Sequence, residues 1–513
     1  MGLHLTVMCL LVVGCVIIFG FVSKVVINIW WRPRRLKAYW ESHGISGPPY
    51  KLFYGNIKEI AALMMQAKSS PMGFSHDILS RALPEIYHWT KIYGRNFVYW
   101  FGPTPRLVIP QPELIRELLS DKSGAFEKPE MPIPLRHLCG DGLTNSKGAK
   151  WARQRRLISP AFHLERLKAM VPMAVESTTD MLQKWENIID SASQEIDVVT
   201  EFRDLTADII AKTSFGGSFE EGKHIFDLQY QQCLLAAESF RKLIIPGYRF
   251  LPTKSNLKAH KIDAELQRAL SEIIMNRQKD ENLDNSDLLS LMMAANRQEK
   301  EHLSMSFQDI IDECKTFFVA GHETTAILLA WSIILLAMHT QWQDKAREEV
   351  LDLCNKDPPN AELLSRLKIV NMIVYEALRL YPPLPFMVRK ASRDVKLGSF
   401  VLPKGTEISV PIAALHHDED LWGRDAKEFN PQRFHEGVSK AATHQAAFMP
   451  FGFGSRICLG MNFSLIEAKV VLAMILQRFS WSLSPAYVHA PAQNFTIRPL
   501  HGAQIVLNKV LYV

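Results

Sequence analysis

The sequence predicts a mainly α-helical protein that carries one N-terminal transmembrane helix. Three long apolar segments support this fold class. The first is an uncharged stretch from Leu5 to Ser23, and the second is a proline-free run from Phe307 to His339. The third, from Met461 to about Phe479, follows a glycine-rich loop. Each is long enough for several helical turns and lacks the regular alternation of polar and apolar residues that marks a strand.

The N-terminal segment predicts a membrane anchor over residues 1–31. At ~1.5 Å per residue, Leu5 to Ser23 nearly crosses a ~30 Å hydrocarbon core, and Lys24 can snorkel from its end. A cleaved signal peptide is the alternative. We disfavour it because no basic region precedes the apolar run and a stop-transfer pattern, Arg32 to Arg35, follows it. The positive-inside rule then predicts that the rest of the chain is cytosolic.

Residues 32–50 contain Pro33 and the run Ser46-Gly47-Pro48-Pro49, which predict a stiff proline-containing hinge after the anchor. Beyond it, residues 51–513 contain no Gly/Ser linker, low-complexity tract or repeat, so we expect one large catalytic domain. The formal net charge is +6, and five cations beside the anchor supply most of it. The remaining chain is nearly neutral, which argues against a nucleic-acid-binding protein.

Seven cysteines occur and none forms a Cys-x-x-Cys pair. An odd number of unpaired cysteines in a cytosolic domain predicts free thiols rather than disulfides or a zinc site.

The segment Phe307 to His339 predicts a long central helix with Ser306 as its N-cap. Its second half, Ala326 to Met338, is apolar on all sides except at Ser332, so this half should be buried.

The sequence Ala320-Gly321-His322-Glu323-Thr324-Thr325 interrupts that apolar helix. Gly321 weakens the helix, and the Thr324 hydroxyl can bond the carbonyl of Ala320 four residues back. A simple kink in a core helix is one interpretation. However, the Glu323 carboxylate would pay a desolvation cost here unless it is paired or used in chemistry.

The segment Asn371 to Tyr381 predicts a helix that Pro382-Pro383 ends. Glu376 and Arg379 are three residues apart and can pair on one face. Most such pairs are solvated, but this face is apolar, so we expect a buried ion pair.

One cysteine near the C-terminus lies in the loop Phe451-Gly452-Phe453-Gly454-Ser455-Arg456-Ile457-Cys458-Leu459-Gly460. Glycines let the backbone pass close to a flat macrocycle, and the helix that follows directs its N-terminal N–H groups at the sulfur, which favours a thiolate. A buried structural cysteine beside a turn is the alternative. A dinucleotide-binding fingerprint is excluded because Ile457 stands where its third glycine belongs. The spacing Phe-x-x-Gly-x-Arg-x-Cys-x-Gly resembles the ligand loop of the cytochrome P450 family of haem-thiolate monooxygenases.

This resemblance implies a mainly α fold with small β-sheets, in which haem b lies between the central helix and the cysteine loop. Cys458 would be the iron ligand, with Phe451, Arg456 and Gly460 around it. In the central helix, Thr324 would be the alcohol that steadies dioxygen and Glu323 the acid that relays protons. Ala320 and Gly321 would form the wall above the haem.

Further motifs extend the resemblance along the chain. Trp151 and Arg155 match the family's Trp-x-x-x-Arg helix and, with Arg389, would contact the haem propionates; the extra cations nearby would form a basic face for an electron donor. Glu376, Arg379 and Arg433 would support the ligand loop without taking part in the chemistry. Gln432 departs from the family's Pro-Glu-Arg-Phe element and removes one carboxylate.

The segments 93–97 and 160–163 resemble the plant clan that oxidises terpenoids, steroids and isoprenoid hormones. Four apolar segments resemble substrate-recognition regions: the loop 126–138, the helix face before Ala320, Leu384 to Met387, and a hairpin tip near Leu500 to Ala503. The resemblance therefore implies an apolar small-molecule substrate.

The chain has no glycine-rich nucleotide site and no flavin motif, so electrons should come from a separate NADPH–cytochrome P450 reductase at the endoplasmic reticulum membrane. Two other functions are weighed against the monooxygenase. A haem-thiolate isomerase or dehydratase tends to lose the acid–alcohol pair, which is intact in Glu323-Thr324. A membrane haem sensor would need neither an apolar pocket nor Thr324.

Overall fold

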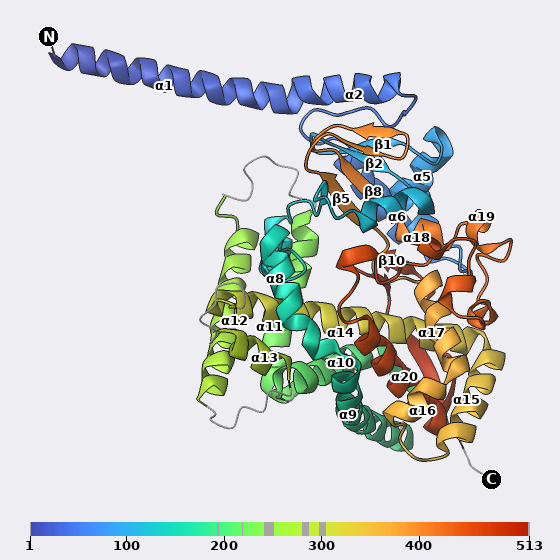
Figure 1. Ribbon diagram of the computed structural model, residues 1–513. Coiled ribbons are helices and arrows are strands. Elements are labelled where there is room, and N and C mark those ends of the chain that lie inside the picture. The colour runs from blue at the N-terminus through green and yellow to red at the C-terminus, as the bar shows by residue number, and fades with distance from the viewer. Residues whose placement is uncertain are drawn as a thin grey trace.

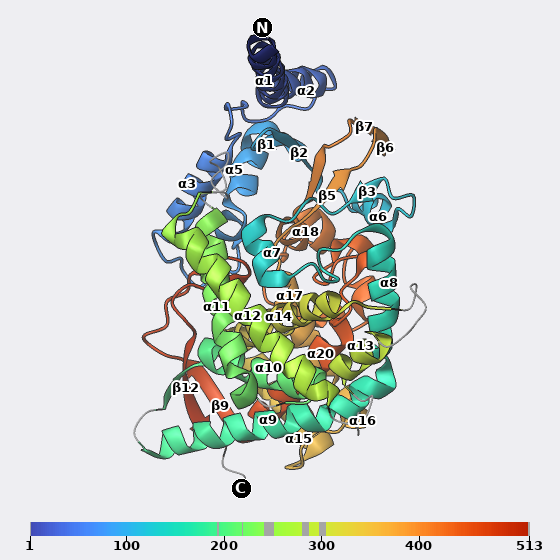
Figure 2. The same ribbon diagram turned by 90° about the vertical axis from the view of Figure 1, so that its left-hand side faces the viewer.

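In the computed structural model, which describes residues 2–191, 194–217, 219–240, 251–279, 287–296 and 304–510, a large helical body carries a smaller strand-rich part. The N-terminal helix α1 (Gly2–Val26) projects away from that body beside the strand-rich part (Figure 1). The described end of the chain lies at the opposite side (Figure 2). This arrangement confirms the predicted fold class, a mainly α protein with small sheets and an N-terminal apolar helix.

The helices of the body follow in order. They are α3 (Ile57–Lys68), α4 (Leu79–Ala82), α5 (Pro84–Tyr93), α6 (Pro112–Ser120), α7 (Ile133–Cys139), α8 (Gly148–Ile158), α9 (Leu164–Ser191), α10 (Val198–Phe215), α11 (Phe219–Phe240), α12 (Lys254–Gln278), α13 (Leu288–Asn296), α14 (Phe307–Met338), α15 (Thr340–Cys354), α16 (Ala361–Arg366), α17 (Lys368–Leu380), α18 (Ile412–His416), α19 (Glu419–Trp422) and α20 (Met461–Arg478).

The strands form four small sheets among the described residues. The largest has the order β1-β2-β8-β5-β3, with β2 and β8 parallel and the other neighbours antiparallel. Its strands are β1 (Val98–Phe101), β2 (Thr104–Val108), β3 (Phe126–Glu127), β5 (Met387–Ala391) and β8 (Glu407–Val410). A second sheet has the order β4 (Glu195–Asp197), β12 (Gln504–Lys509) and β9 (Phe479–Leu483). A third pairs β6 (Val395–Leu397) with β7 (Phe400–Leu402). A fourth pairs β10 (Pro491–Gln493) with β11 (Ile497–Pro499).

The segment predicted as a hinge is partly helical. A short π-helical stretch (Ile27–Trp31) joins α1 to α2 (Arg32–Ser42) in one continuous helical run, with Pro33 as the second residue of α2. α2 contacts the strand-rich part: the Tyr39 hydroxyl donates to the Val401 carbonyl at 2.7 Å, and Trp40 is buried. Residues 43–50 contain no helix or strand, and the Ser46 carbonyl accepts from the Val98 N–H of the large sheet at 3.1 Å.

The central helix α14 has the predicted extent to within one residue. Ser306 caps it, and Asp309 completes a capping box by accepting from the Ser306 N–H. The helix packs against α10, α17 and α20, and Thr325 to Ala337 are all buried, which confirms the prediction for its second half. The helix is continuous through Gly321, so the predicted interruption does not break it.

Among the described residues, two helical segments are long and apolar enough to cross a membrane, by length and composition. One is α14, which is mostly buried in the body and is therefore a core helix. The other spans Met8–Ser42 and exposes apolar side chains along its length, including Phe19 and Phe21. A helix with this exposure needs an apolar surrounding such as a bilayer. All seven cysteines are free thiols, as predicted.

Candidate active site

The cysteine loop has a tight backbone that brings Cys458 to the start of α20. The Cys458 N–H donates to the Phe451 carbonyl at 2.9 Å, which closes the loop. Gly454 adopts a φ of +73°, and a Cβ there would lie 2.0 Å from the Leu119 carbonyl oxygen. Glycine is therefore required at Gly454 by both conformation and space.

The Cys458 side chain is open to an internal cavity although it lies deep in the protein. Burial raises the pKa of the Cys458 thiol, and the Gly460 N–H, Arg155 and Lys128 oppose that rise. The helix N-terminus predicts a lowered pKa for Cys458. The pKa is raised instead, because the desolvation of the thiolate outweighs its favourable interactions with these groups. A metal cation bound at the sulfur would reverse the balance.

The opposite wall of this cavity is the middle of α14. The Thr324 hydroxyl donates to the Ala320 carbonyl at 2.8 Å, which confirms the bond predicted from the sequence. Gly321 lets α10 approach, since a Cβ at Gly321 would lie 2.6 Å from Ile210 Cδ1. The small residues Ala320 and Gly321 thus leave a shallow surface facing the cysteine loop.

The cavity between the two walls has a volume of about 330 Å³ and a mostly apolar lining. The structure brings to it all nine residues expected to contact a cofactor, together with Thr324. The nine are Trp151, Arg155, Ala320, Gly321, Arg389, Phe451, Arg456, Cys458 and Gly460. Glu323 is absent from this lining, and Glu376, Arg379 and Arg433 lie outside it.

Several cations crowd one part of the cavity wall. The Arg456 guanidinium donates to the Ser146 carbonyl at 3.0 Å and lies 4.3 Å from the Trp151 ring centre. Burial and the charges of Arg389 and Arg456 lower the pKa of Lys128 to about 7. Burial and Arg456 likewise lower the pKa of Arg389 to about 10. Lys128 was not among the residues selected from the sequence.

These cations call for an anionic partner. Within the described ranges, Lys128, Arg389 and Arg456 form no ion pair with an acidic side chain. Three neighbouring positive charges in an apolar cavity destabilise one another unless an anion compensates them. Haem carries two carboxylates on a flat apolar macrocycle, so cations, apolar walls and a facing thiol fit this cofactor.

Glu323 faces away from the cavity, toward the hairpin β10–β11. Its Oε1 lies 3.3 Å from Arg498 Nη2 and accepts a hydrogen bond from the Thr496 hydroxyl at 3.0 Å. The carboxylate is therefore paired, and this pairing offsets the desolvation cost that is expected for Glu323 in an apolar helix. Both partners are distant in sequence, and no local pattern pointed to them.

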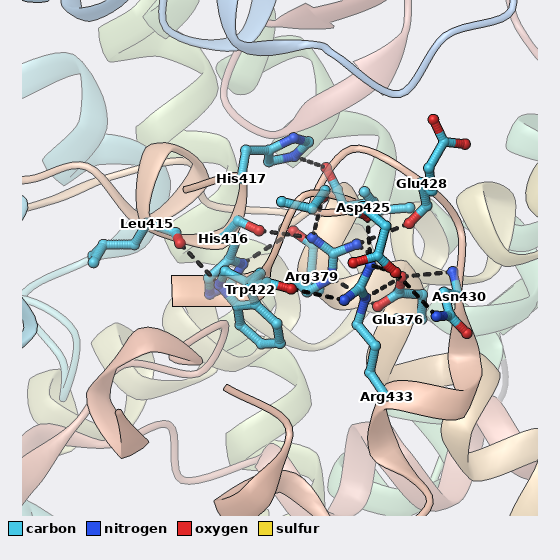
Figure 3. Close-up of polar contacts among 12 residues, drawn as sticks. Glu376, Arg379, Leu415, His416, His417, Trp422, Asp425, Glu428, Asn430 and Arg433 are labelled. Atoms are coloured by element: carbon cyan, nitrogen blue, oxygen red, sulfur yellow. Dashed lines mark hydrogen bonds and ion pairs between the residues drawn. The ribbon is translucent and has the colours of Figure 1, made fainter. Parts of the chain in front are cut away.

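Glu376, Arg379 and Arg433 form a buried ion-pair network (Figure 3). Arg379 Nε and Nη2 donate to Glu376 Oε2 and Oε1, each at 2.7 Å, and both side chains are 0% exposed. This confirms the predicted buried pair. Arg379 also donates to the carbonyls of His416, Ala426 and Glu428, so all its donor groups are used.

Arg433 joins the network through two carboxylates. Arg433 Nε lies 3.5 Å from Glu376 Oε1, and Arg433 Nη2 lies 2.6 Å from Asp425 Oδ2 (Figure 3). The arginine is therefore paired although Gln432 beside it carries no carboxylate. The sequence analysis did not identify Asp425 as a partner.

His416 connects the network to the cysteine loop. Its Nε2 accepts from the Met449 N–H at 3.1 Å, and its Nδ1 lies 3.1 Å from the Arg379 carbonyl oxygen. Burial, aided by the charges of His417 and Arg379, lowers the pKa of His416 to about 3, so the ring is neutral. The two bonds require the tautomer with a proton on Nδ1.

Three of the extra cations near Trp151 are paired with carboxylates, whereas the sequence predicts a basic face there. Lys147 pairs with Glu130, while Lys150 and Arg153 lie 2.9 Å and 3.7 Å from the Asp309 carboxylate. These pairs reduce the positive charge available on this face.

One predicted substrate-recognition segment is wrong. The β10–β11 hairpin turns at residues 494–496, and its tip residue Phe495 lines a cavity. Leu500 and Ala503 line none of the cavities described in this structure, because they follow β11. The other segments do reach cavities: Leu384 and Phe386 line two of them.

Known proteins resemble this chain over nearly its whole length. A family model described as cytochrome P450 matches residues 80–503. Cytochrome P450 734A1 of Arabidopsis thaliana is 46% identical over 494 residues, which cover 94% of this chain and 93% of that protein. Cytochrome P450 CYP72A616 of Paris polyphylla is 45% identical, covering 94% and 95%. Cytochrome P450 72A397 of Kalopanax septemlobus is 45% identical, covering 96% of both.

Proposed function

The chain belongs to the cytochrome P450 family of haem-thiolate monooxygenases, and on that basis we propose that it inserts one oxygen atom of dioxygen into an apolar plant metabolite. The second oxygen atom leaves as water, which requires two protons and two electrons. The electrons come from NADPH through a separate reductase.

One observation carries the proposal: the thiol of Cys458 and the hydroxyl of Thr324 line the same apolar cavity from the cysteine loop and from α14. A cofactor held at the thiol would share this apolar cavity with the Thr324 hydroxyl. A buried structural cysteine would not need that cavity.

In this proposal Cys458 would be the protein ligand to the haem iron. Arg456, Arg389, Trp151 and Arg155 would hold the carboxylates, and the position of Lys128 adds it to this group. When bound through the thiolate, haem would supply the activation of dioxygen. Phe451 and Gly460 line the cavity beside Cys458.

The acid and alcohol of α14 handle protons. Thr324 Oγ1 would orient dioxygen in the cavity by hydrogen bonding, which requires its single O–H to turn away from the Ala320 carbonyl to which it now donates. Glu323 relays protons from the side of the helix where Arg498 and Thr496 hold its carboxylate. Ala320 and Gly321 leave room above the cofactor. Glu376, Arg379 and Arg433 support the loop and touch no reacting atom.

The apolar lining supports a terpenoid, a steroid or a related metabolite as the substrate class. The plant origin of the similar proteins agrees with this class. The basic residues near Trp151 support an acidic electron donor, an NADPH–cytochrome P450 reductase.

We assign residues 1–31 to a transmembrane anchor, 32–50 to a connecting segment and 51–513 to the catalytic domain. The apolar surface of α1 supports a single crossing of the endoplasmic reticulum membrane. The cations Arg32, Arg34 and Arg35 then favour a cytosolic catalytic domain.

The full chain, reconstituted with a plant NADPH–cytochrome P450 reductase, tests the proposal. Terpenoids and steroids that shift the haem spectrum should each yield a product heavier by one oxygen atom. Label from ¹⁸O₂ should enter that product only when NADPH and the reductase are both present.

Two outcomes would contradict the proposal. Conversion of an organic peroxide without NADPH, combined with no ¹⁸O₂ incorporation, would indicate an isomerase or dehydratase. Haem binding without any product from the panel would indicate a sensor.

A further inference from the structure

The loop that joins α7 to α8, residues 140–147, holds two cations of the cavity wall through its backbone. The Thr144 carbonyl accepts a hydrogen bond from Lys128 Nζ at 2.7 Å. The Ser146 carbonyl accepts from both Arg456 Nη1 and Arg456 Nη2, each at 3.0 Å. The position of this loop therefore sets where the two side chains direct their charge.

Two side chains of α14 bond the backbone at and just before this loop. Glu313 Oε2 accepts a hydrogen bond from the Leu143 N–H at 3.0 Å. The Thr316 hydroxyl donates to the carbonyl of Cys139, the last residue of α7, at 2.7 Å. Glu313 and Thr316 are three residues apart, so they share one face of the helix. This face of α14 is therefore the surface on which the loop rests.

The loop lies so close to α14 that it leaves no space for a side chain at Gly142. A Cβ there would lie 2.7 Å from Glu313 Oε2 and 2.6 Å from Thr316 Oγ1. At Gly140 φ is +68°, and a Cβ would lie 2.7 Å from the Asp312 carbonyl oxygen. Glycine permits both this conformation and this close approach, so the backbone of the loop contacts the helix directly.

The buried carboxyl group of Glu313 has a cost that its bond to the loop offsets in part. Glu313 is 0% exposed, and burial raises the pKa of its carboxyl group to about 8. The Leu143 N–H opposes that rise, while the charges of Asp309 and Asp312 add to it. Burying a carboxyl group costs free energy, and the hydrogen bond to Leu143 recovers some of it. A glutamine amide could make the same bond, because its oxygen also accepts.

We propose that Glu313 is a positioning residue for the groups that hold the haem carboxylates. By accepting from the Leu143 N–H, Glu313 fixes the loop whose carbonyls orient Lys128 and Arg456. Glu313 does not line the cavity, so it acts through these two cations and not on the reacting atoms. The inference rests on the proposed haem site and adds to it a residue about two helical turns before Ala320.

Haem release and the reduction potential of the full-length haem protein test this inference. Transfer of haem to excess apomyoglobin gives the release rate, and a redox titration gives the potential. Glu313→Leu should release haem about 10-fold faster than the wild type, as is typical when a group that orients a cofactor's contacts is lost. Its potential should fall, because cations held near the haem favour the state that carries an additional electron.

Two further variants separate the hydrogen bond from general stability. Glu313→Gln keeps an acceptor oxygen and should match the wild type in both measurements. Glu349→Leu is the matched control, since Glu349 in α15 also accepts backbone N–H groups, from Ile369 at 2.8 Å and from Val370 at 3.0 Å, and lines no described cavity. Its replacement should lower the thermal midpoint of unfolding but leave haem release and the potential unchanged.

Gly142→Ala decides the test if Glu313→Leu does not load haem. It keeps the Glu313 carboxyl group but introduces a Cβ that pushes the loop away from α14. Haem release and the potential should therefore change in the same direction as in Glu313→Leu.

Wild-type haem release and potential in Glu313→Leu, or in Gly142→Ala where Glu313→Leu lacks haem, refute the inference. Equal impairment of Glu313→Gln and Glu313→Leu also refutes it, as does faster release with an unchanged potential. None of these measurements uses substrate, NADPH or reductase, so none bears on the proposed function, which ¹⁸O₂ incorporation tests separately. Conversely, the expected changes in a protein that yields no NADPH-dependent product would retain the inference and reject the monooxygenase.

Discussion

Arg498 Nη2 lies 3.3 Å from Glu323 Oε1, so an arginine of the C-terminal hairpin pairs with the acid of the central helix. The two residues are on different elements, β11 and α14, and both side chains are largely buried. The pair, together with the bond from the Thr496 hydroxyl, holds the Glu323 carboxyl group on the hairpin side of α14. In the proposed relay, a proton passing from Glu323 to the Thr324 side of the helix would depend on this ion pair.

Arg498→Leu should slow product formation roughly 10-fold or more, because Glu323 loses the cation that orients its carboxyl group on this side of α14. Arg498→Lys keeps the charge and is the control. Wild-type turnover in Arg498→Leu would reduce the pair to a structural role.

Thr324→Ala should uncouple NADPH consumption from product formation. Haem content and substrate-induced spectral shifts should persist, because the Thr324 side chain is not an iron ligand and its removal frees little volume. Hydrogen peroxide should rise while product falls, and Thr324→Ser should restore coupling. Glu323→Gln should differ by lowering turnover with less peroxide. An unchanged ratio of product formed to NADPH consumed in Thr324→Ala would mean that the Thr324 side chain serves only to bond the Ala320 carbonyl.

Cys458→Ser should abolish the thiolate-type carbon monoxide spectrum of the reduced protein. The reason is that the Cys458 sulfur is the proposed ligand at the cavity. Cys354→Ser removes a buried thiol in α15 that lines no described cavity and should keep the spectrum. A thiolate-type spectrum in Cys458→Ser would refute the ligand assignment.

Glu376→Ala should lose haem or folding before it loses chemistry. It leaves the buried Arg379 without its carboxylate partner, at a cost of about 3–5 kcal/mol, while Arg433 keeps Asp425. Arg433→Ala should have the same kind of effect, while Gln432→Glu, which adds the family's carboxylate, should be tolerated. Haem content and the thermal midpoint of unfolding are measured for each of these variants. Normal stability in Glu376→Ala would contradict the network's supporting role.

The neutral state of His416 predicts a pH-dependent difference between the wild type and His416→Gln. The unfolded pKa is about 6.5, and the folded pKa is about 3. Below pH 6.5 the unfolded chain therefore binds the proton first, and the stability that His416 contributes is lost as the pH falls.

Denaturant unfolding at pH 7.5, 6.5 and 5.5 measures this effect. His416→Gln should be less stable at pH 7.5, where the bonds to Met449 and Arg379 are intact in the wild type. The difference should shrink below pH 6.5 by up to about 1.4 kcal/mol per pH unit. A constant difference across this range would mean that His416 is not buried as a neutral ring.

The sequence by itself determined the features that depend on short separations along the chain. The Ser306 cap, the bond from Thr324 to Ala320 and the Glu376–Arg379 pair each join residues three or four positions apart. Helical geometry places such residues on one face whatever the rest of the protein does. The spacing of the loop around Cys458 was equally informative, because its glycine and cysteine positions are set by the local backbone.

Only the tertiary structure decided which distant groups meet. Packing brought Arg498 to Glu323, gave Arg433 a partner in Asp425, and placed Lys128 beside Arg389 and Arg456. It also located the hairpin turn at residues 494–496. No periodic pattern in the sequence predicts these contacts, because the position of each partner depends on how whole helices and hairpins pack against one another.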